Sequence, residues 1–293
     1  RDLAPKTMEL YTWTAGHIRD QLGSIRLTDL TVDHIEAMLD RLATREQAPL
    51  SRSSLTKVRG TLQRAIAFAE RRGKAIRNPA LAATITPHAP RSQPRQALVP
   101  DEARTLLAAL RGERDGLMFG LSLRLGLRPG ESAALYWSDV EGGAVNVVRG
   151  VRRDRGRPVV VDEVKTEGSR RTIDLPDDLS AWLADHRRQQ AAEILAAPSW
   201  ADARIVFPTR VGTVTDPTKA RRRLAKICTE AGVTVVRPNE LRHSCASLLS
   251  DAGVPLELIA DLLGHASTDM LDRTYRHRLR PSIDVAARAT WAD

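Results

Sequence analysis

The segment from Thr86 to Gln96, TPHAPRSQPRQ, constrains the fold more than any other feature of this sequence. It holds three prolines and carries no periodic pattern of apolar residues, so neither a helix nor a strand is expected to pass through it. Proline-rich stretches stay extended and semi-rigid. We therefore expect a linker at residues 86–97 between a domain at 1–85 and a second domain at 98–293, and a chain of 293 residues is long enough to give both a core.

Residues 1–85 show the spacing of amphipathic helices, in which apolar side chains recur every three or four positions. The three apolar stripes are Met8, Tyr11, Ile18 and Leu22; Val32, Ile35, Leu39 and Leu42; and Leu55, Val58, Leu62 and Ile66. Thr31 is a candidate N-cap for the second helix, and Asn78 with Pro79 stops the chain soon after the third. The first domain is therefore predicted to be helical.

The charge of the chain favours a polyanionic partner. The formal net charge is +9, and basic proteins of this kind most often bind nucleic acid. Residues 52–77 carry eight basic side chains against one acid, Glu70. A solvated helix face would also explain such a run, but its bias to one sign favours phosphate contact. The side chains expected to contact DNA are Arg52, Lys57, Arg59, Arg64, Arg71, Arg72 and Lys74.

Strand-like alternation first occurs in the second domain. It is present in AVNVVRGV at 144–151, in RPVVV at 157–161 and in SRRTIDL at 169–175. We expect the last two strands to be joined across a polar turn at Glu167 and Gly168. The sequence thus predicts a small antiparallel sheet.

Helical patterns surround these strands. A first helix is expected to begin near Pro100, where the acids that follow suit a helix N-terminus. Further helical patterns occupy 177–197, 216–231, 240–250, 255–263 and 268–278. The predicted fold class is mainly α with a small antiparallel β-sheet, arranged as a helical domain followed by a mixed α+β domain.

The cysteine content and the hydropathy bear on the compartment. Only Cys228 and Cys245 occur, both within helical patterns, so no disulfide framework is expected and a reducing cytoplasm is favoured. No apolar run approaches 18 residues, and no signal peptide is visible. The chain begins at Arg1 rather than Met, the start expected of a fragment that lacks an N-terminal segment.

Three basic residues of the second domain are candidates for binding an anion. Arg128 stands in GLRPGE, where an ordinary capping arginine is the alternative, and Lys165 precedes the predicted turn, where a solvated lysine is the alternative. Arg242 stands in RPNELRHSCASLL, in the first turn of a helix whose predicted N-cap is Asn239. The start of a helix presents backbone N–H groups to an anion, and an arginine there adds two parallel donors.

The stretch LLGHASTDMLDRTYRHR, which starts at Leu262, supplies two more candidates. Because glycine accepts the left-handed conformation, Gly264 is expected to cap its helix and to direct His265 out of the turn. Tyr275 follows ten positions after that histidine, and its alternative role is simple packing one turn after Leu271. Each candidate is weak alone.

The order of the candidates resembles the tyrosine recombinase (phage integrase) family. That family uses Arg, Lys, His or Lys, Arg, His or Trp, and Tyr in this chain order. The matching residues here are Arg128, Lys165, Arg242, His265 and Tyr275. The resemblance covers roughly residues 98–280, and its strongest blocks are LRHS and LLGH…TYRH. The helical, basic first domain and the linker also resemble the family's core-binding domain.

Two further positions match the family's pattern in part. Asn239 stands where the family often has a histidine, and its amide can donate and accept hydrogen bonds but cannot exchange a proton near neutral pH. Glu131, three residues after Arg128, matches an acidic position that helps to hold the active site in the family.

The resemblance implies a site-specific DNA recombinase or integrase of a phage or integrative element, which cuts and rejoins DNA through a 3′-phosphotyrosine. Arg128 and Arg242 would bind the non-bridging oxygens of the phosphate and stabilise the transition state. His265 would hydrogen-bond to the same phosphate. Tyr275 would attack phosphorus, and Lys165 would protonate the leaving 5′-oxygen.

The resemblance also implies the partners. No metal or other cofactor is expected, since the arginines neutralise the phosphate and the sequence lacks a P-loop, a carboxylate cluster and paired Cys/His ligand spacing. The expected partners are double-stranded DNA, further copies of the chain in a tetrameric synapse, and accessory DNA-bending proteins, without a membrane, at the nucleoid of a bacterial cytoplasm. The tail from about residue 281, PSIDVAARATW, is expected to dock on a neighbouring subunit.

Three other interpretations remain open at this point. A type IB topoisomerase uses similar chemistry but relaxes DNA as a monomer, without contacts that exchange between subunits. A non-catalytic DNA-binding protein derived from a recombinase would fit Asn239 but not an intact Tyr275. Metal binding by His243, His265 and His277 lacks an acid or a cysteine to complete the site.

Overall fold

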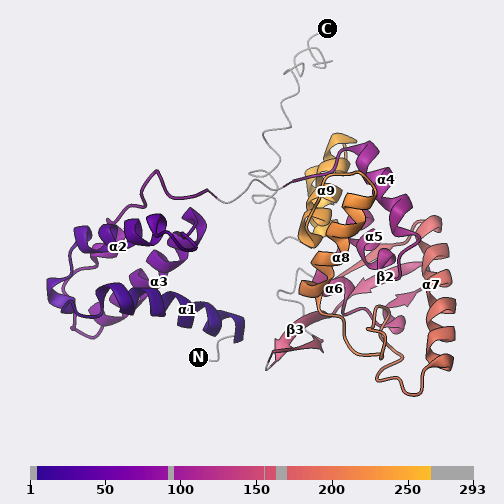
Figure 1. The fold of residues 1–293 in the computed structure, drawn as a ribbon, viewed down its shortest axis with the longest axis horizontal. Coiled ribbons are helices and arrows are strands. Elements are labelled where there is room, and N and C mark those ends of the chain that lie inside the picture. Colours follow the sequence, from indigo (N-terminus) through magenta and orange to yellow (C-terminus); the bar gives the residue numbers. More distant parts are fainter. Residues whose placement is uncertain (1–4, 92–95, 155, 163–169, 265–293) are drawn as a thin grey trace, which may run out of the picture. The chain divides into compact units, whose positions relative to one another are not determined.

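The computed structural model describes residues 5–91, 96–154, 156–162 and 170–264. The chain divides into two compact units, Arg1–Pro94 and Arg95–Asp293, and the division falls inside the proline-rich segment (Figure 1). Each unit has its own hydrophobic core.

Helices are the regular secondary structure of the described part of the first unit. It consists of α1 (Pro5–Leu22), the 3-10 helix η1 (Leu27–Asp29), α2 (Val32–Thr44), α3 (Arg52–Glu70) and the 3-10 helix η2 (Pro79–Leu81). As predicted, Thr31 is the N-cap of α2, and its Oγ1 accepts a hydrogen bond from the backbone N of His34 at 3.3 Å. The core of this unit includes the predicted stripes of α2 and α3, of which Val32 is only partly buried.

The stripe predicted for α1 is only partly right. Leu22 is buried, but Met8 is 50% exposed. The fully buried side chain in the middle of α1 is Thr14, whose Oγ1 lies 3.1 Å from the Oγ1 of Thr61 on α3. Because α1 meets α3 through a pair of threonines, apolar spacing alone does not reveal which face of α1 is buried.

The second unit contains the remaining helices. They are α4 (Pro100–Leu110), α5 (Gly116–Arg124), α6 (Pro129–Ser132), the 3-10 helix η3 (Trp137–Asp139), α7 (Asp177–Ala196), α8 (Pro217–Glu230), α9 (Pro238–Asp251) and α10 (Leu256–Leu263). Helix α5 is buried from Gly116 to Leu123 and contacts α4, α7 and α9, so it lies at the centre of this unit. The helix predicted at 268–278 lies outside the described residues.

The strands confirm the predicted small antiparallel sheet but not its pairing. Strands β1 (Val140–Glu141), β2 (Ala144–Val147) and β5 (Arg171–Asp174) form a three-stranded sheet in the order β1-β2-β5. Strands β3 (Gly150–Asp154) and β4 (Arg157–Val161) form a separate hairpin at the edge of the unit (Figure 1).

Two expectations about these strands are therefore wrong. The alternating run at 144–151 is split between β2 and β3, and the strand at 157–161 pairs with β3 instead of with 171–174. The signal missed was Gly156, whose φ of 80° supplies the left-handed residue that a tight hairpin turn requires. The predicted turn at Glu167 and Gly168 lies outside the described residues.

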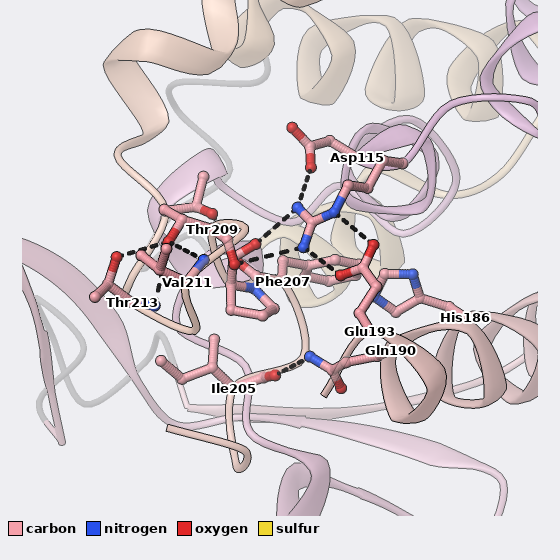
Figure 2. A network of polar contacts seen from close by, with 12 residues as sticks. Asp115, His186, Gln190, Glu193, Ile205, Phe207, Thr209, Val211 and Thr213 are labelled. Carbon is pink, nitrogen blue, oxygen red and sulfur yellow. Dashed lines mark hydrogen bonds and ion pairs between the residues drawn. The ribbon is translucent and has the colours of Figure 1, made fainter. Parts of the chain in front are cut away.

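A polar network joins α7 to the segment that follows it. Nε and Nη2 of Arg114 donate to the two carboxylate oxygens of Glu193 on α7 at 2.9 and 2.8 Å, and Nη1 donates to the backbone O of Pro208 at 3.0 Å. Gln190 Nε2 donates to the backbone O of Ile205 at 2.8 Å (Figure 2). These bonds hold the irregular segment after α7 in place. They also give its backbone carbonyls hydrogen-bond partners, which hydrophobic contacts alone would not supply.

The remaining global features concern the thiols and the helix lengths. Cys228 and Cys245 are both buried free thiols. Among the helices of the described ranges, none combines the length and the hydropathy that crossing a membrane demands.

Candidate active site

Helix α9 carries two of the predicted site residues, Asn239 and Arg242. Its N-cap is Arg237, whose backbone N donates to Glu240 Oε2 at 2.7 Å, and Pro238 is the first helical residue. Asn239 is therefore the exposed second residue of the helix, and the prediction that it is the N-cap is wrong. Proline is favoured at the first helical position because it has no N–H to leave unpaired, and Glu240 supplies the reciprocal cap.

Arg242 lies in the second turn of α9, not in the first. It is only 6% exposed, and its Nη1 donates to the backbone O of Gly126 at 2.6 Å. Its Nη2 donates to the backbone O of Leu263, the last residue of α10. The expected arrangement of Arg242 at the start of its helix is corrected accordingly, because its guanidinium group reaches inward to carbonyls of two other segments.

Gly126 permits this approach. Its φ is 65°, and a Cβ atom at this position would lie 2.3 Å from Cδ2 of Leu263. The backbone between α5 and α6 can therefore lie against the end of α10 only because residue 126 has no side chain.

Arg128 and Glu131 are bonded to each other twice. Arg128 precedes the short helix α6, and its backbone N donates to Glu131 Oε2 at 2.9 Å. Its Nη1 donates to Glu131 Oε1 at 2.6 Å. The Glu131 side chain is 5% exposed, whereas the Arg128 side chain is 38% exposed. Glu131 therefore fixes both the backbone and the guanidinium group of an arginine whose outer surface still meets solvent.

The sequence interpretation missed Arg171. This residue begins β5, and its side chain is only 8% exposed. Its Nη2 donates to Glu131 Oε2 at 2.9 Å, and its Nε donates to the backbone O of Leu262 at 2.6 Å. A signal was present, since in a strand of period two Arg171 shares the face of Ile173, which is buried.

Three consecutive carbonyls at the end of α10 each accept a hydrogen bond from a different arginine. Leu262 O accepts from Arg171, Leu263 O from Arg242, and Gly264 O from Arg128 Nη2 at 3.3 Å. The last carbonyls of a helix have no partner within the helix and carry partial negative charge. We call Arg128, Glu131, Arg171 and Arg242 the arginine centre.

Charge is unbalanced in the arginine centre, where three guanidinium groups surround one carboxylate. Burial raises the pKa of Glu131, but the Arg171 charge and the hydrogen bonds from Arg171 and Arg128 outweigh burial, so its pKa lies below the ordinary value. Burial and then the Arg128 charge lower the pKa of Arg242 to about 9. Burial also raises the pKa of the Cys245 thiol to about 12. An anion bound here would offset the repulsion among the arginines.

The other predicted catalytic residues are only partly located. Gly264 ends α10 in the left-handed conformation, with φ 61° and ψ 54°, as predicted. Lys165, His265 and Tyr275 lie outside the described residues. The structure thus brings Arg128, Arg242 and Glu131 together beside the end of α10, which directly precedes His265 in the chain. Asn239 is exposed at the start of α9.

The basic side chains predicted to contact DNA lie in and after α3. Lys57, Arg64 and Arg71 recur at intervals of seven residues, are exposed, and lie on the helix face opposite the buried stripe. Arg59 differs, because it is half-buried and its Nη1 donates to the backbone O of Ala83 at 2.7 Å. Its bond to Ala83 gives Arg59 a structural role within the first unit. The exposed members of the predicted set, besides the three named, are Arg52, Arg72 and Lys74.

The metal-binding alternative concerns His243, His265 and His277. In the ranges that the structure describes, no three His, Cys, Asp or Glu side chains lie close enough together to hold a metal ion. Of the three histidines of the metal-binding alternative, only His243 lies within these ranges.

Comparison with known proteins places the chain in a family. Residues 96–280 match the phage integrase family. An integrase of Streptomyces ambofaciens is 34% identical over 286 residues, which cover 92% of this chain and 71% of the relative. A XerC-like tyrosine recombinase of Caldanaerobacter subterraneus subsp. tengcongensis is 30% identical over 60% of this chain, and the match spans only 49% of that relative.

Solved structures agree on the fold. The Tn1549 transposon integrase in complex with a circular intermediate DNA is similar with a TM-score of 0.81 at 17% identity, over 99% of this chain and 94% of the other. The lambda integrase tetramer bound to a Holliday junction has a TM-score of 0.69 at 22% identity, over 92% of this chain and 74% of the other. With the family match over most of the second unit and the integrase relative over nearly the whole chain, this protein belongs to the phage integrase family of tyrosine-type site-specific recombinases.

Proposed function

We propose that this recombinase cuts one DNA strand with Tyr275 and rejoins it through a 3′-phosphotyrosine link, as the integrase of a phage or integrative element. The arginine centre is the observation that carries the proposal. Arg128, which precedes α6, and Arg242 of α9 donate to the carbonyls of Gly264 and Leu263, and positive charge exceeds negative charge there. A phosphodiester is the anion that such a centre would accommodate.

Each residue then has a role that follows from its chemistry. Arg128 and Arg242 neutralise the non-bridging oxygens as charge grows in the pentavalent transition state, and Glu131 keeps Arg128 in place. His265 donates a hydrogen bond to the same phosphate. Tyr275 attacks phosphorus, and Lys165 gives a proton to the leaving 5′-oxygen.

The covalent intermediate explains why no energy source is required. The phosphodiester bond energy is kept in the phosphotyrosine, so the 5′-hydroxyl of an exchanged strand can attack it and restore DNA. Asn239, exposed at the start of α9, would contribute a hydrogen bond near the phosphate and no proton transfer.

The two units divide the work of holding DNA. Residues 1–85 act as the core-binding domain, with contacts from the basic side chains of α3, and 98–293 form the catalytic domain, joined by the linker at 86–97. Related integrases have been solved with DNA, one as a tetramer on a Holliday junction. For this chain we propose double-stranded DNA as substrate, a tetrameric synapse, and the help of accessory DNA-bending proteins, at the nucleoid of a bacterial cytoplasm.

The experiment is a covalent-adduct assay on nicked DNA. A library of duplexes with a randomised segment and one nick is incubated with the protein, and DNA that stays attached in detergent is recovered and sequenced. With a selected duplex, a label on the strand 5′ of the break is expected to remain on the protein, and Tyr275→Phe is expected to bind the duplex and form no adduct. A protein-linked 5′ end, or an adduct with Tyr275→Phe, would refute the proposal.

A plasmid assay separates recombination from relaxation. Supercoiled plasmid without a selected site is expected to stay supercoiled, whereas two selected sites in one plasmid are expected to recombine. Relaxation of both plasmids without recombination would instead indicate a type IB topoisomerase.

A further inference from the structure

Arg171 occupies a place in the sheet where a buried apolar residue would be ordinary. It is the first residue of β5 and lies opposite Val147 of β2, whose side chain is buried. The neighbouring Arg170 is exposed and donates to the backbone O of Asp162 at 3.2 Å. Burying a guanidinium group is expensive unless it is paired, so the buried member of these two adjacent arginines requires an explanation.

The partners of Arg171 supply that explanation. Its Nη2 contacts Glu131 Oε2 at 2.9 Å, the same oxygen that accepts the backbone N–H of Arg128. Its Nε contacts Leu262 O at 2.6 Å. The next two carbonyls, of Leu263 and Gly264, accept from Arg242 and Arg128. Arg171 therefore binds Glu131, the carboxylate that holds Arg128. It also binds the end of α10, which Arg128 and Arg242 both contact.

We propose that Arg171 is a positioning residue for strand cleavage: it holds Glu131 and the last turn of α10 in place, and thereby sets where Arg128 and Arg242 meet the scissile phosphate. The proposal rests on the proposed function, since it assigns those two arginines to the phosphate. It adds a residue outside the set that the family resemblance supplied. Arg171 also joins β5 to the end of α10. In the chain, β5 follows the Lys165 segment and α10 precedes His265.

The two bonds explain why arginine suits this position. A guanidinium group presents separate nitrogens in one rigid plane, so Nε and Nη2 can serve a carbonyl and a carboxylate at once. A lysine ammonium has one nitrogen on a flexible chain and would keep the charge but not both directions. Arg171→Lys and Arg171→Gln therefore separate charge from geometry.

The test compares these variants with Arg170→Gln, a matched control that removes the same charge from the adjacent exposed position. Single-turnover cleavage of a selected nicked duplex, its dissociation constant and the melting temperature are measured for each. For Arg171→Gln we expect cleavage to fall by about 10- to 100-fold, the scale of a small misplacement near reacting groups. Binding of the duplex is expected to change little for either variant, and Arg170→Gln is expected to cleave as wild type does.

The pH profile gives a readout that general destabilisation would not. The charges that face Glu131 are Arg128 before α6, Arg171 on β5 and Arg242 on α9. Without Arg171, burial acts on Glu131 with less opposition, and its pKa rises. Cleavage by Arg171→Gln is then expected to recover with rising pH across a range where wild type is flat, and Glu131→Gln in the same chain is expected to remove that dependence.

The outcomes decide the proposal. Arg171→Gln with wild-type cleavage and a flat profile would overturn it, and so would a rate loss that is equal at every pH. If Arg171→Gln does not fold, Arg171→Lys decides: normal melting with slower cleavage supports positioning, and normal cleavage overturns it. Wild-type protein without any adduct would instead refute the proposed function, so the two failures are distinguishable.

Discussion

Glu131 receives two hydrogen bonds from Arg128, one from the guanidinium Nη1 at 2.6 Å and one from the backbone N at 2.9 Å. A single buried carboxylate thus fixes the main chain and the side chain of the arginine beside it. A carboxylate that holds a cation in this way keeps it available without occupying all five of its N–H donors.

Replacing Glu131 tests this arrangement. Glu131→Gln is expected to bind DNA at least as tightly as wild type, because a negative charge is removed, and to cleave about tenfold more slowly or worse, because Arg128 loses its anchor. The stability difference from wild type also has a pH signature. The folded pKa lies below the ordinary 4.5, so the carboxylate stabilises the fold above that pH and the gain is lost as the pH falls through the folded pKa. Urea unfolding at pH 7 and below pH 4 checks it, and an equal difference at both would contradict it.

Gly126 is expected to be sensitive to the smallest side chain. Gly126→Ala combines a positive φ with a clash against Leu263, and together these are expected to cost about 2 to 4 kcal/mol. Gly142→Ala is the matched control, since Gly142 has φ 60° and nothing within 4 Å, and about 1 kcal/mol is expected there. Chemical denaturation measures both. Equal losses would show that the close approach to Leu263 does not matter.

The change at Asn239 separates a structural role from a chemical one. Because Arg237 is the N-cap, Asn239→Ala is expected not to cause the loss of ~1 kcal/mol in stability that removal of an N-cap causes. Asn239→Asp is expected to leave melting unchanged but to slow single-turnover cleavage at least tenfold, since like charges at about 4 Å repel by about 4 kcal/mol at an effective dielectric of about 20. Wild-type cleavage by Asn239→Asp would remove this residue from the site.

The basic face of α3 predicts a salt dependence. Lys57, Arg64 and Arg71 replaced together by Gln are expected to weaken DNA binding and to flatten the log–log salt slope by up to about 2.7, or about 0.9 for each lost phosphate contact. Removing residues 1–90 is expected to flatten it further. Arg187→Gln with Arg188→Gln on α7 is the control for exposed charge. An unchanged slope in the triple variant would place the DNA contacts elsewhere.

We expect the stability of the second unit to fall in acid because of His186. Burial lowers its pKa below 6.5, and the Arg114 charge lowers it further, while its bond to Val206 O and the Glu193 charge act in the other direction. As the pH falls below 6.5, the unfolded chain takes up a proton before the folded chain does, so stability falls. His186→Gln, which retains a donor for Val206 O, is expected to lose less stability between pH 7 and about 5. His88→Gln, at an exposed histidine, is expected to behave as wild type.

Some of this protein follows from the sequence alone. The stripe of Leu55, Val58 and Leu62, the cap at Thr31 and the left-handed end at Gly264 were all predicted, because each depends on neighbours within one or two turns of the same chain. The order of Arg128, Arg242, His265 and Tyr275 likewise suffices to indicate the family, since order is a property of the chain and not of its folding.

Tertiary structure decided which groups meet. Alternation of apolar residues predicted a strand at 157–161 but not its pairing with β3. The alternation looks the same in every strand, so it does not indicate which strand is the partner. Likewise, period two places Arg171 on the face of buried Ile173, but only the folded chain brings Arg171 against Glu131 and Leu262. Hydrogen bonds between segments distant in the chain leave no periodic trace in it. The order of the residue types that we propose as catalytic can therefore be read from the sequence, whereas the contacts that hold Arg128 and Arg242 in place exist only in the folded chain.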